Sequence, residues 1–410
     1  MLQVCKKLDV GFRAHVKSHK TIELACLQVG ETGPANFIVS TLIEAEHLAD
    51  LVLRWQGSGR EASILYGIPV PQSAIPRLIS LAHKLLPRTL NVIVDNLEAF
   101  AKLQTAFSTV ADEIGVFIKI DTGYHRAGIT TSSANFAKLV EAVTSASKGT
   151  FFQGFYSHYG HSYGGSSEDD AATGLIEELI GLETACAALP TDYAGTKPIL
   201  TVGATPTATA AQNMLFSSSP RVQEFHDILA RLQTKYAVEL HAGVYPLLDC
   251  QQIATHARPS SSPASECFQP LSKDSIAIRM LLEVTSIYTE RSKPEALVSA
   301  GSLALGRDPC KSYPGWGVVT PDLANARNKV FDETGDGTGW IVGRISQEHG
   351  VLSWEGDKDE CKQFEVGDKV MVWPNHACVA GAGFGWYLVV DSEEGDGETV
   401  VDVWCRWRGW

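Results

Sequence analysis

From residue 10 to about residue 245, the sequence alternates short runs of aliphatic and β-branched residues with longer stretches whose apolar residues recur every three or four positions. The short runs predict strands and the longer stretches predict helices. The strand candidates are residues 10–17, 37–40, 64–70, 91–95, 116–122, 152–158, 198–204 and 237–242. The helix candidates between them include residues 42–55, 73–86, 97–110, 135–145, 169–189 and 221–236. Strand–helix units of this spacing predict a TIM-type (β/α)8 barrel. An open doubly wound sheet is the main competitor, but the glycine-rich first turn typical of that fold is missing.

The pattern changes after residue 254. Residues 259–265 are rich in proline and serine, as is typical of a linker. Beyond them, strand candidates follow one another with almost no helical periodicity, at residues 275–288, 296–303, 340–345, 370–373, 387–391 and 399–406. We therefore predict a barrel domain over residues 1–254, a linker over 255–274 and a mainly antiparallel β domain over 275–410.

Composition excludes several classes of protein. The 410 residues are 44% hydrophobic and carry a formal net charge of −13, which argues against a nucleic-acid-binding surface. No apolar run approaches the ~18 residues of a membrane span, and residues 1–12 lack the apolar core of a signal peptide. Nine scattered cysteines without a C-x-x-C pair are typical of a reducing compartment. We expect a cytoplasmic protein with neither a nucleic-acid nor a membrane partner.

A basic motif stands at residues 13–21, beside the first predicted strand. In an extended chain, Arg13, His15, Lys17 and His19 would share one face, and such a face needs an anionic partner. If the face lines a pocket, neighbouring positive charge and partial desolvation favour the neutral amine of Lys17, which is able to attack an aldehyde. That chemistry is the one used by a pyridoxal-phosphate lysine. The alternative is a solvated basic edge strand.

Active-site groups of a barrel collect at the carboxyl ends of its strands, where this chain is polar throughout. After the seventh strand, Gly203 permits close backbone approach and Thr205 and Thr207 add hydroxyl donors, which favours a phosphate site. The alternative there is an ordinary capped turn.

Two other strand ends carry ionisable groups. Arg126 follows the fifth strand and could bind a cofactor phenolate or a substrate carboxylate, although an ion pair with Asp121 would explain it equally well. His158, His161 and Tyr163 follow the sixth strand. They could position a cofactor or relay protons, or form a satisfied hydrogen-bond network.

His376 and Cys378 lie two residues apart in the predicted β domain and would point to the same side of an extended segment. An imidazole and a thiol suit a borderline-soft ion such as zinc. A closed structural site needs four protein ligands, so this pair favours a metal with positions left for substrate or water. A free buried cysteine beside an incidental histidine is the alternative.

Seven motifs together resemble the fold-type III pyridoxal-phosphate enzymes, in which an alanine-racemase-like barrel precedes a β domain. The similarity is closer to the eukaryotic zinc-dependent D-serine dehydratases, within the wider D-threonine aldolase group. The motifs are residues 13–21, 64–69, 121–128, 156–163, 203–207, 347–350 and 374–378.

The resemblance implies two cofactors, pyridoxal 5′-phosphate and Zn²⁺. It makes Lys17 the Schiff-base lysine and catalytic base, and it implies that His376 and Cys378 bind zinc. It also implies that Tyr163, Gly203, Thr205 and Tyr245 hold the cofactor. With the strand-end candidates Arg126 and Tyr156, the predicted cofactor-binding set is Lys17, Arg126, Tyr156, Tyr163, Gly203, Thr205 and Tyr245. The expected reaction is β-elimination of D-serine to pyruvate and ammonia, with zinc acting on the hydroxyl group, and a homodimer is expected.

Two other functions stay open. A D-threonine aldolase would use the same lysine to break the Cα–Cβ bond, but members of that group are expected to have a carboxylate where Cys378 stands. A non-catalytic pyridoxal-phosphate-binding protein would resemble the barrel alone. Two departures from the family also stand out: Val244 replaces the usual asparagine, and the lysine motif lies close to Met1, so a truncated or inactive form is one expectation.

Overall fold

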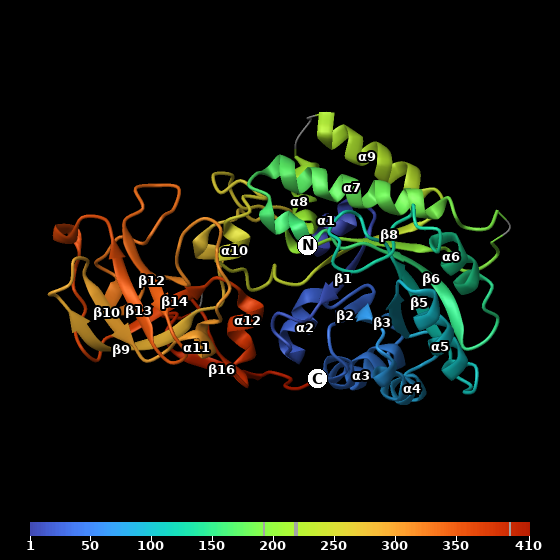
Figure 1. Ribbon diagram of the computed structural model, residues 1–410, viewed down its shortest axis with the longest axis horizontal. Helices are drawn as coiled ribbons and strands as arrows, with labels where there is room; N and C mark the ends of the chain where they lie inside the picture. The colour runs from blue at the N-terminus through green and yellow to red at the C-terminus, as the bar shows by residue number, and fades with distance from the viewer. Residues whose placement is uncertain (192, 217–219, 393–394) are drawn as a thin grey trace. The chain divides into compact units, whose positions relative to one another are not determined.

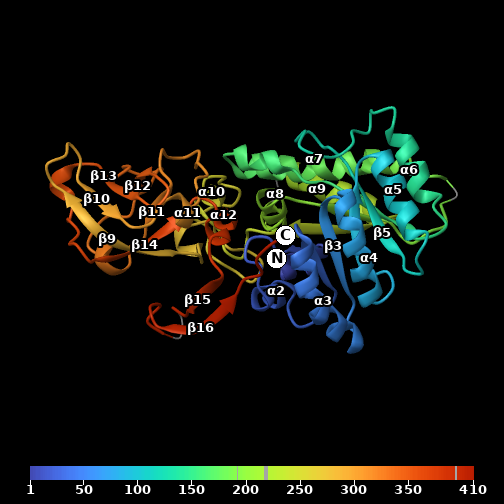
Figure 2. The same ribbon diagram turned by 60° about the horizontal axis from the view of Figure 1, so that its bottom comes forward.

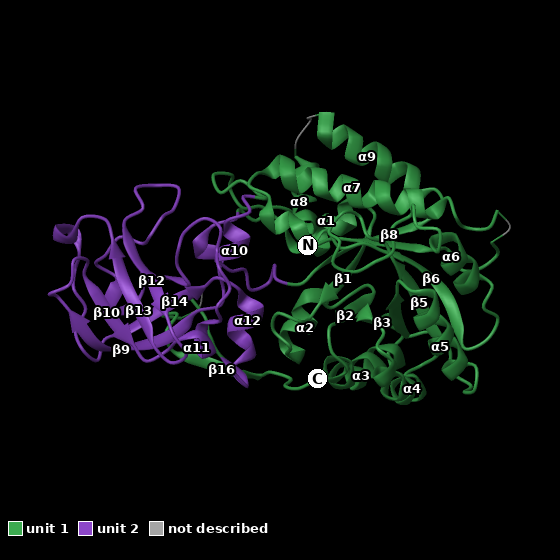
Figure 3. Ribbon diagram, viewed as in Figure 1, with its two compact units in different colours: residues 1–243, 257–270, 388–410 green, residues 244–256, 271–387 purple. Residues whose placement is uncertain are grey.

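The computed structural model describes residues 1–191, 193–216, 220–392 and 395–410. The chain forms two compact units, and Figure 3 shows them in different colours. The first unit comprises residues 1–243, 257–270 and 388–410, and the second comprises residues 244–256 and 271–387. The units are interleaved along the chain, whereas the predicted domains, 1–254 and 275–410 with a linker at 255–274, are continuous. That residues 1–254 and 275–410 fold as separate domains stays a prediction.

The first unit is a closed barrel of parallel strands that lie in sequence order (Figure 1). Its strands are β1 (Gly11–His15), β2 (Ala35–Val39), β3 (Ala62–Pro69), β4 (Leu90–Val94), β5 (Ile114–Lys119), β6 (Thr150–Tyr156), β7 (Ile199–Val202) and β8 (Ala237–Ala242). All residues of β4 and β5 are buried, as expected for parallel strands covered on both faces. The predicted TIM-type barrel is confirmed.

Helices surround this barrel. They are α1 (Leu2–Lys7), α2 (Ile22–Val29), α3 (Leu42–Gly57), α4 (Ile75–Lys84), α5 (Leu97–Phe107), α6 (Phe136–Thr144), α7 (Glu168–Cys186), α8 (Thr205–Ala210) and α9 (Pro220–Gln233), with 3-10 turns at Gln72–Ala74, Gly160–Gly164 and Asn213–Leu215. Local sequence sets where they begin: the Ser167 hydroxyl accepts a hydrogen bond from the amide of Asp170, and acidic residues in the first turn complement the dipole of α7. No helix among the described residues is long and apolar enough to cross a membrane.

The second unit is a closed barrel of antiparallel strands in the order β10-β13-β12-β11-β14-β9. Their bounds are β9 (Met280–Tyr288), β10 (Glu295–Val298), β11 (Gly317–Val319), β12 (Gly339–Ile345), β13 (Gly350–Glu355) and β14 (Lys369–Pro374), and the short helices are α10 (Cys250–Ile253), α11 (Ser302–Leu305) and α12 (Ala377–Ala382). Trp340 and Trp354 face each other across β12 and β13, with ring centroids 5.7 Å apart in the core. The predicted antiparallel β structure is confirmed.

The last two strands pair with each other only. Figure 2 shows this two-stranded sheet of β15 (Trp386–Val390) and β16 (Val400–Cys405). Residues 388–410 belong to the first compact unit, so the chain returns to the (β/α)8 barrel at its end. Sequence patterns found both strands but placed them with the β domain, since no local signal tells which core a two-stranded sheet joins.

Candidate functional site

Lys17 lies in the tight turn that joins β1 to α2, at the carboxyl end of β1. The amide of Lys20 closes this turn with a 2.8 Å hydrogen bond to the carbonyl of Val16. Helix α2 then starts at Thr21, whose hydroxyl accepts a hydrogen bond from the amide of Leu24. The turn therefore presents Lys17 at the end of the barrel where active sites of this fold collect.

The predicted basic face of residues 13–19 is wrong, because the strand ends at His15 and the chain then turns. The Arg13 guanidinium donates to both carboxylate oxygens of Glu239, at 2.8 and 3.0 Å. The His19 ring is bound to Gln28 of α2 and to Thr21, at 2.8 and 3.2 Å. The alternative of a solvated edge is wrong as well, since Arg13 and His19 are 2% and 0% exposed.

A small cavity opens at the ends of β1, β6, β7 and β8, within the first unit. It is lined by His15, Lys17, His158, Tyr163, Ala204, Thr205, His241, Ala242 and Gly243. The structure thus brings together three predicted site residues, Lys17, Tyr163 and Thr205, from three different loops. Concave sites that combine an amine, imidazoles and hydroxyls are where ligands bind in this fold.

Three imidazoles surround the amine of Lys17. Burial lowers the pKa of His15, His158 and His241 well below the usual range, and neighbouring cationic side chains, Lys17 among them, lower it further. All three rings are therefore neutral near pH 7. The three histidines therefore add no positive charge to the cavity.

His241 carries a buried polar atom without a partner. Its Nδ1 lies 3.0 Å from the hydroxyl of Thr201, and its ring stacks on Tyr156 at a centroid distance of 4.6 Å. Its Nε2 is buried and has no hydrogen-bond partner in the described part of the chain. Buried polar atoms are nearly always hydrogen-bonded. The unpartnered Nε2 of His241 therefore fits a cavity whose lining hydrogen-bonds to a bound ligand.

Glu178 of α7 organises the loops behind the cavity. Its carboxylate accepts hydrogen bonds, each of 3.0 Å, from the Ser157 hydroxyl, the Tyr159 amide, the Gly203 amide and the Thr207 hydroxyl. Burial raises the pKa of Glu178 to about 7, although these four donors act to lower it. One side chain therefore ties the loops after β6 and β7 together.

Gly203 is required by packing between strands. Its φ is +142°, and a Cβ there would lie 2.2 Å from the carbonyl oxygen of His241. The close backbone approach that was expected of a phosphate at Gly203 is thus made by β8. Thr207, the other expected phosphate donor, is hydrogen-bonded to Glu178. Ala204 and Thr205 are the residues of this loop that line the cavity. The part of Gly203 in cofactor binding stays a prediction.

The other predicted cofactor residues do not line the cavity. Arg126 is exposed, with its guanidinium 4.8 Å from the centre of the Tyr124 ring, and the alternative partner Asp121 is bound to His125 instead. Tyr156 is buried within the barrel, where burial raises its pKa, and Lys119 Nζ lies 5.0 Å from its ring centre. Tyr245 belongs to the second unit.

Sequence reasoning missed Glu178 and gave His241 no role. A signal for Glu178 existed, because it lies three residues after Leu175 and four before Leu182, in the apolar stripe of α7. A charged residue in such a stripe is buried and needs partners. His241 had no signal beyond its place at the end of β8.

His376 and Cys378 lie within the second unit, at the junction of β14 and α12. His376 is the extended N-cap residue of α12 and Cys378 lies in its first turn, so the segment is extended only as far as His376 and not to Cys378 as predicted. His376 Nδ1 is hydrogen-bonded to the carboxylate of Asp308. Burial opposes protonation of this ring, but Cys378 and Asp308 outweigh burial and raise the pKa of His376 to about 9.

The donor set of this pair fits zinc. A carboxylate on one imidazole nitrogen directs the other nitrogen toward a metal, and a thiol is a preferred zinc ligand. A bound metal ion would replace the proton that the ring otherwise holds. The described residues contain no group of three or more His, Cys, Asp or Glu side chains able to hold a metal, so the chain supplies His376 and Cys378 as an incomplete set.

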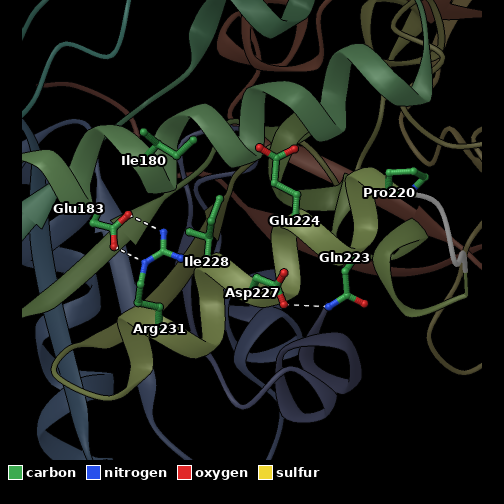
Figure 4. A pocket seen from close by; sticks show the side chains of 8 residues that line it. All are labelled: Ile180, Glu183, Pro220, Gln223, Glu224, Asp227, Ile228 and Arg231. Carbon is green, nitrogen blue, oxygen red and sulfur yellow. Dashed lines mark hydrogen bonds and ion pairs between the residues drawn. The ribbon is translucent and has the colours of Figure 1, made fainter.

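A larger hollow, about 600 Å³, lies away from the strand ends, between α7 and α9 on the outside of the barrel (Figure 4). Four of its polar residues already pair with one another. Arg231 donates to both oxygens of Glu183, at 2.6 and 2.8 Å, and Gln223 donates to Asp227 at 2.8 Å. We place the functional site at the smaller cavity, because the reactive groups converge there.

The barrel with a lysine at the end of its first strand defines an alanine-racemase-like protein. Residues 2–221 match the family model "Alanine racemase, N-terminal domain", and residues 277–390 match "Putative serine dehydratase domain". The chain is 34% identical to the D-serine dehydratase of Schizosaccharomyces pombe, over 100% of this chain and 88% of that protein. It is 32% identical to the D-serine dehydratase of Saccharomyces cerevisiae, over 98% and 89%. The chain belongs to the D-serine dehydratase family.

Solved structures agree on the fold. D-threo-3-hydroxyaspartate dehydratase from Delftia sp. HT23 has a TM-score of 0.72 at 25% identity, covering 100% of this chain and 93% of that one. D-threonine aldolase from Filomicrobium marinum has a TM-score of 0.70 at 21% identity, covering 98% and 89%. The resemblance inferred from the seven motifs is confirmed.

Proposed function

We propose that this protein is a D-serine dehydratase that eliminates the hydroxyl group of D-serine to give pyruvate and ammonia, with pyridoxal 5′-phosphate and Zn²⁺ as cofactors. The observation that carries the proposal is the cavity at the end of β1, where Lys17 stands among three neutral imidazoles. Its chain is 34% identical to a protein named for this activity.

The residues of the cavity fit pyridoxal phosphate. Lys17 supplies the amine, and Tyr163 and Thr205 supply hydroxyl groups. His241 Nε2, which has no hydrogen-bond partner in the described residues, can bind a polar group of the cofactor. We include Arg126, Tyr156, Gly203 and Tyr245 in the proposed cofactor-binding set. When bound, the cofactor supplies an electron sink for the charge that develops at the substrate Cα.

Lys17 Nζ is the proposed base that takes the α-proton of the substrate. His158 supports it with a fixed tautomer: the carbonyl oxygen of Gly203 can only accept, so Nδ1 of the neutral ring donates to it. The bare Nε2 of His158 is then an acceptor at the lining of the cavity, where it orients or receives a proton.

His376 and Cys378 are the proposed zinc ligands. Hydroxide is a poor leaving group, and a Lewis acid on the β-hydroxyl is the chemistry that makes elimination feasible near neutral pH. Asp308 holds Nδ1 of His376 and thereby orients the ring.

A single assay tests the reaction. Purified protein with pyridoxal phosphate is incubated with D-serine or L-serine, with zinc or with EDTA, and pyruvate is measured. Pyruvate from D-serine only, and only with metal, is the expected result. Pyruvate from L-serine alone would overturn the stereochemistry, and full activity of metal-free protein would overturn the zinc role.

The lysine assignment has its own test, because a second lysine, the buried Lys119, lies near the cavity. Burial, with the charge of Arg126, lowers its pKa to about 8, so it too is a capable nucleophile. Borohydride reduction followed by peptide mapping identifies the lysine that carries the cofactor. The label is expected on Lys17, and a label on Lys119 would refute the assignment.

Aldol cleavage is the second candidate, since relatives include the 3-hydroxy-D-aspartate aldolase of Paracoccus denitrificans, 24% identical over 97% of this chain. The Cys378 thiol favours zinc and elimination. Glycine released from D-threonine or D-3-hydroxyaspartate, without a keto acid, would favour the aldolase. A protein that binds the cofactor but turns over neither substrate would be a non-catalytic binder.

The proposal includes a cytoplasmic homodimer that acts on a small D-amino acid, with no nucleic-acid or membrane partner. All nine cysteines are free, in keeping with a reducing compartment. Size-exclusion chromatography with light scattering tests the dimer.

A further inference from the structure

We propose that the C-terminal segment, residues 406–410, is a positioning element for Lys17, because it fixes the turn between β1 and α2 from the outside. This inference rests on the proposed function only in taking Lys17 as the cofactor lysine. The contacts themselves lie within one compact unit, which contains both the turn and residues 388–410.

The turn needs external support. Lys20 has a φ of +55°, in the left-handed region that residues other than glycine seldom adopt. Such a conformation persists only where the surroundings hold it. On the inner side, Ser18 donates to the carbonyl of Gly243 and His19 is bound to Gln28, so the turn is tied to β8 and α2.

The C-terminal segment supplies the outer support. Arg406 Nε donates to the carbonyl of His19 at 2.9 Å, and the amide of Trp407 donates to the carbonyl of Lys20 at 2.8 Å. Two consecutive carbonyls of the lysine turn are therefore bound by residues almost 390 positions later in the chain. Arg406 and Trp407 are 7% and 6% exposed, so solvent does not replace these contacts.

The segment is itself anchored to a rigid element. The indole of Trp407 stacks on His47 of α3, with centroids 5.6 Å apart and planes at 5°. The side chain of Lys20 reaches the same helix, where its Nζ lies 3.0 Å from the carboxylate of Glu44. The turn, the segment and α3 thus form one connected block that fixes the backbone at His19 and Lys20, two and three residues after Lys17.

Arg406 and Trp407 are not among the residues that line the cavity. Arg406 and Trp407 therefore act through Lys17, and we assign them as positioning residues. Loss of the segment should leave the reactivity of the Lys17 amine unchanged but let the amine sample more positions. Cofactor binding should then weaken, because the covalent bond to the cofactor needs an amine in a fixed place.

The test uses the full-length chain with Arg406→Ala, and Arg408→Ala as the matched control. Both variants remove one positive charge from the same segment, but Arg408 is exposed. Hydrogen exchange of residues 16–21 is followed by mass spectrometry on cofactor-free protein, and the cofactor dissociation constant is measured separately by titration.

Arg406→Ala should speed exchange of residues 16–21 by at least tenfold over wild type, with β4 and β5 unchanged, and should weaken cofactor binding about tenfold. Arg408→Ala should match wild type in both, and Arg406→Lys should recover part of the loss because it can still donate to His19. Should Arg406→Ala not fold, His47→Ala, which removes only the stacking partner of Trp407, should show a smaller effect in the same direction.

Unchanged exchange at residues 16–21 in both Arg406→Ala and His47→Ala would overturn the proposal. So would an equal effect of Arg408→Ala. Because the exchange readout needs neither cofactor nor substrate, it fails or succeeds independently of the dehydratase assignment. Failure of the wild-type protein to bind pyridoxal phosphate would instead sink the proposed function.

Discussion

His158 and Gly203 are joined by a 2.8 Å hydrogen bond from Nδ1 of the imidazole to the main-chain carbonyl oxygen. The amide of the same glycine donates to Glu178. One peptide segment after β7 thus links the buried carboxylate of α7 to a ring that lines the cavity. The ring receives a fixed orientation and tautomer from the backbone, which leaves its Nε2 for the substrate side.

We therefore expect His158→Asn to separate support of the loop from chemistry at Nε2. Asparagine places an amide donor near the position of Nδ1, so it should keep cofactor binding and the thermal midpoint. It lacks an acceptor at Nε2, so kcat should fall by about 10²-fold, as is typical when an acid–base group is lost. Steady-state kinetics and thermal melts decide. Near wild-type kcat in His158→Asn would show that the ring serves only to hold Gly203.

Glu178→Gln should destabilise the protein. The carboxylate accepts four hydrogen bonds, whereas an amide accepts with one oxygen and turns an NH₂ group toward donors. We expect a loss of about 2 kcal/mol in the free energy of unfolding, the scale for buried groups left unsatisfied. Glu177→Gln is the control, since Glu177 is exposed and its loss should stay within about 0.5 kcal/mol. Urea unfolding of cofactor-free protein measures both, and equal effects would contradict the assigned role.

Much of the fold follows from local pattern. The eight barrel strands carry near-continuous apolar runs, and each stands within a few residues of its predicted place. Sequence missed β11 and β13, because Gly317–Val319 is only three residues long and Gly350–Glu355 follows a turn without a strong breaker. β15 and β16 pair with each other, but the compact unit that such a pair joins depends on contacts far along the chain, which periodicity does not encode.

The candidate site was harder to predict than the fold. Lys17, Tyr163 and Thr205 were found because each stands at a strand end, and the barrel rule brings those ends together. The predicted shared face of Arg13 and His19 failed because it assumed that the strand continued past His15. A strand's length is fixed by its neighbours: β1 pairs with β2 only as far as His15.

Acid should destabilise the lysine turn through His19. Burial is the main cause that lowers the pKa of His19 to about 4, from an unfolded value near 6.5. Because the unfolded chain binds the proton more readily, the stability from the neutral ring is full above pH 6.5 and is lost as pH falls toward 4. The loss can reach about 3 kcal/mol. His19→Gln lacks the titrating ring, so the stability advantage of wild type over this variant should shrink as pH falls from 6.5 to 4. A stability difference that does not change with pH would refute the role of this ring.

Zinc affinity should depend on Asp308, which does not itself have to touch the metal. Its carboxylate is hydrogen-bonded to Nδ1 of His376, and partners of this kind typically change metal affinity 10- to 100-fold. We expect Asp308→Asn to bind zinc about tenfold or more weakly in a competition assay with a chromogenic chelator, and to regain D-serine turnover at high zinc. Asp322→Asn, which breaks the ion pair with Arg279 in the same unit, is the control and should leave zinc affinity unchanged. Wild-type affinity in Asp308→Asn would mean that His376 is oriented by other contacts, or that zinc binds elsewhere.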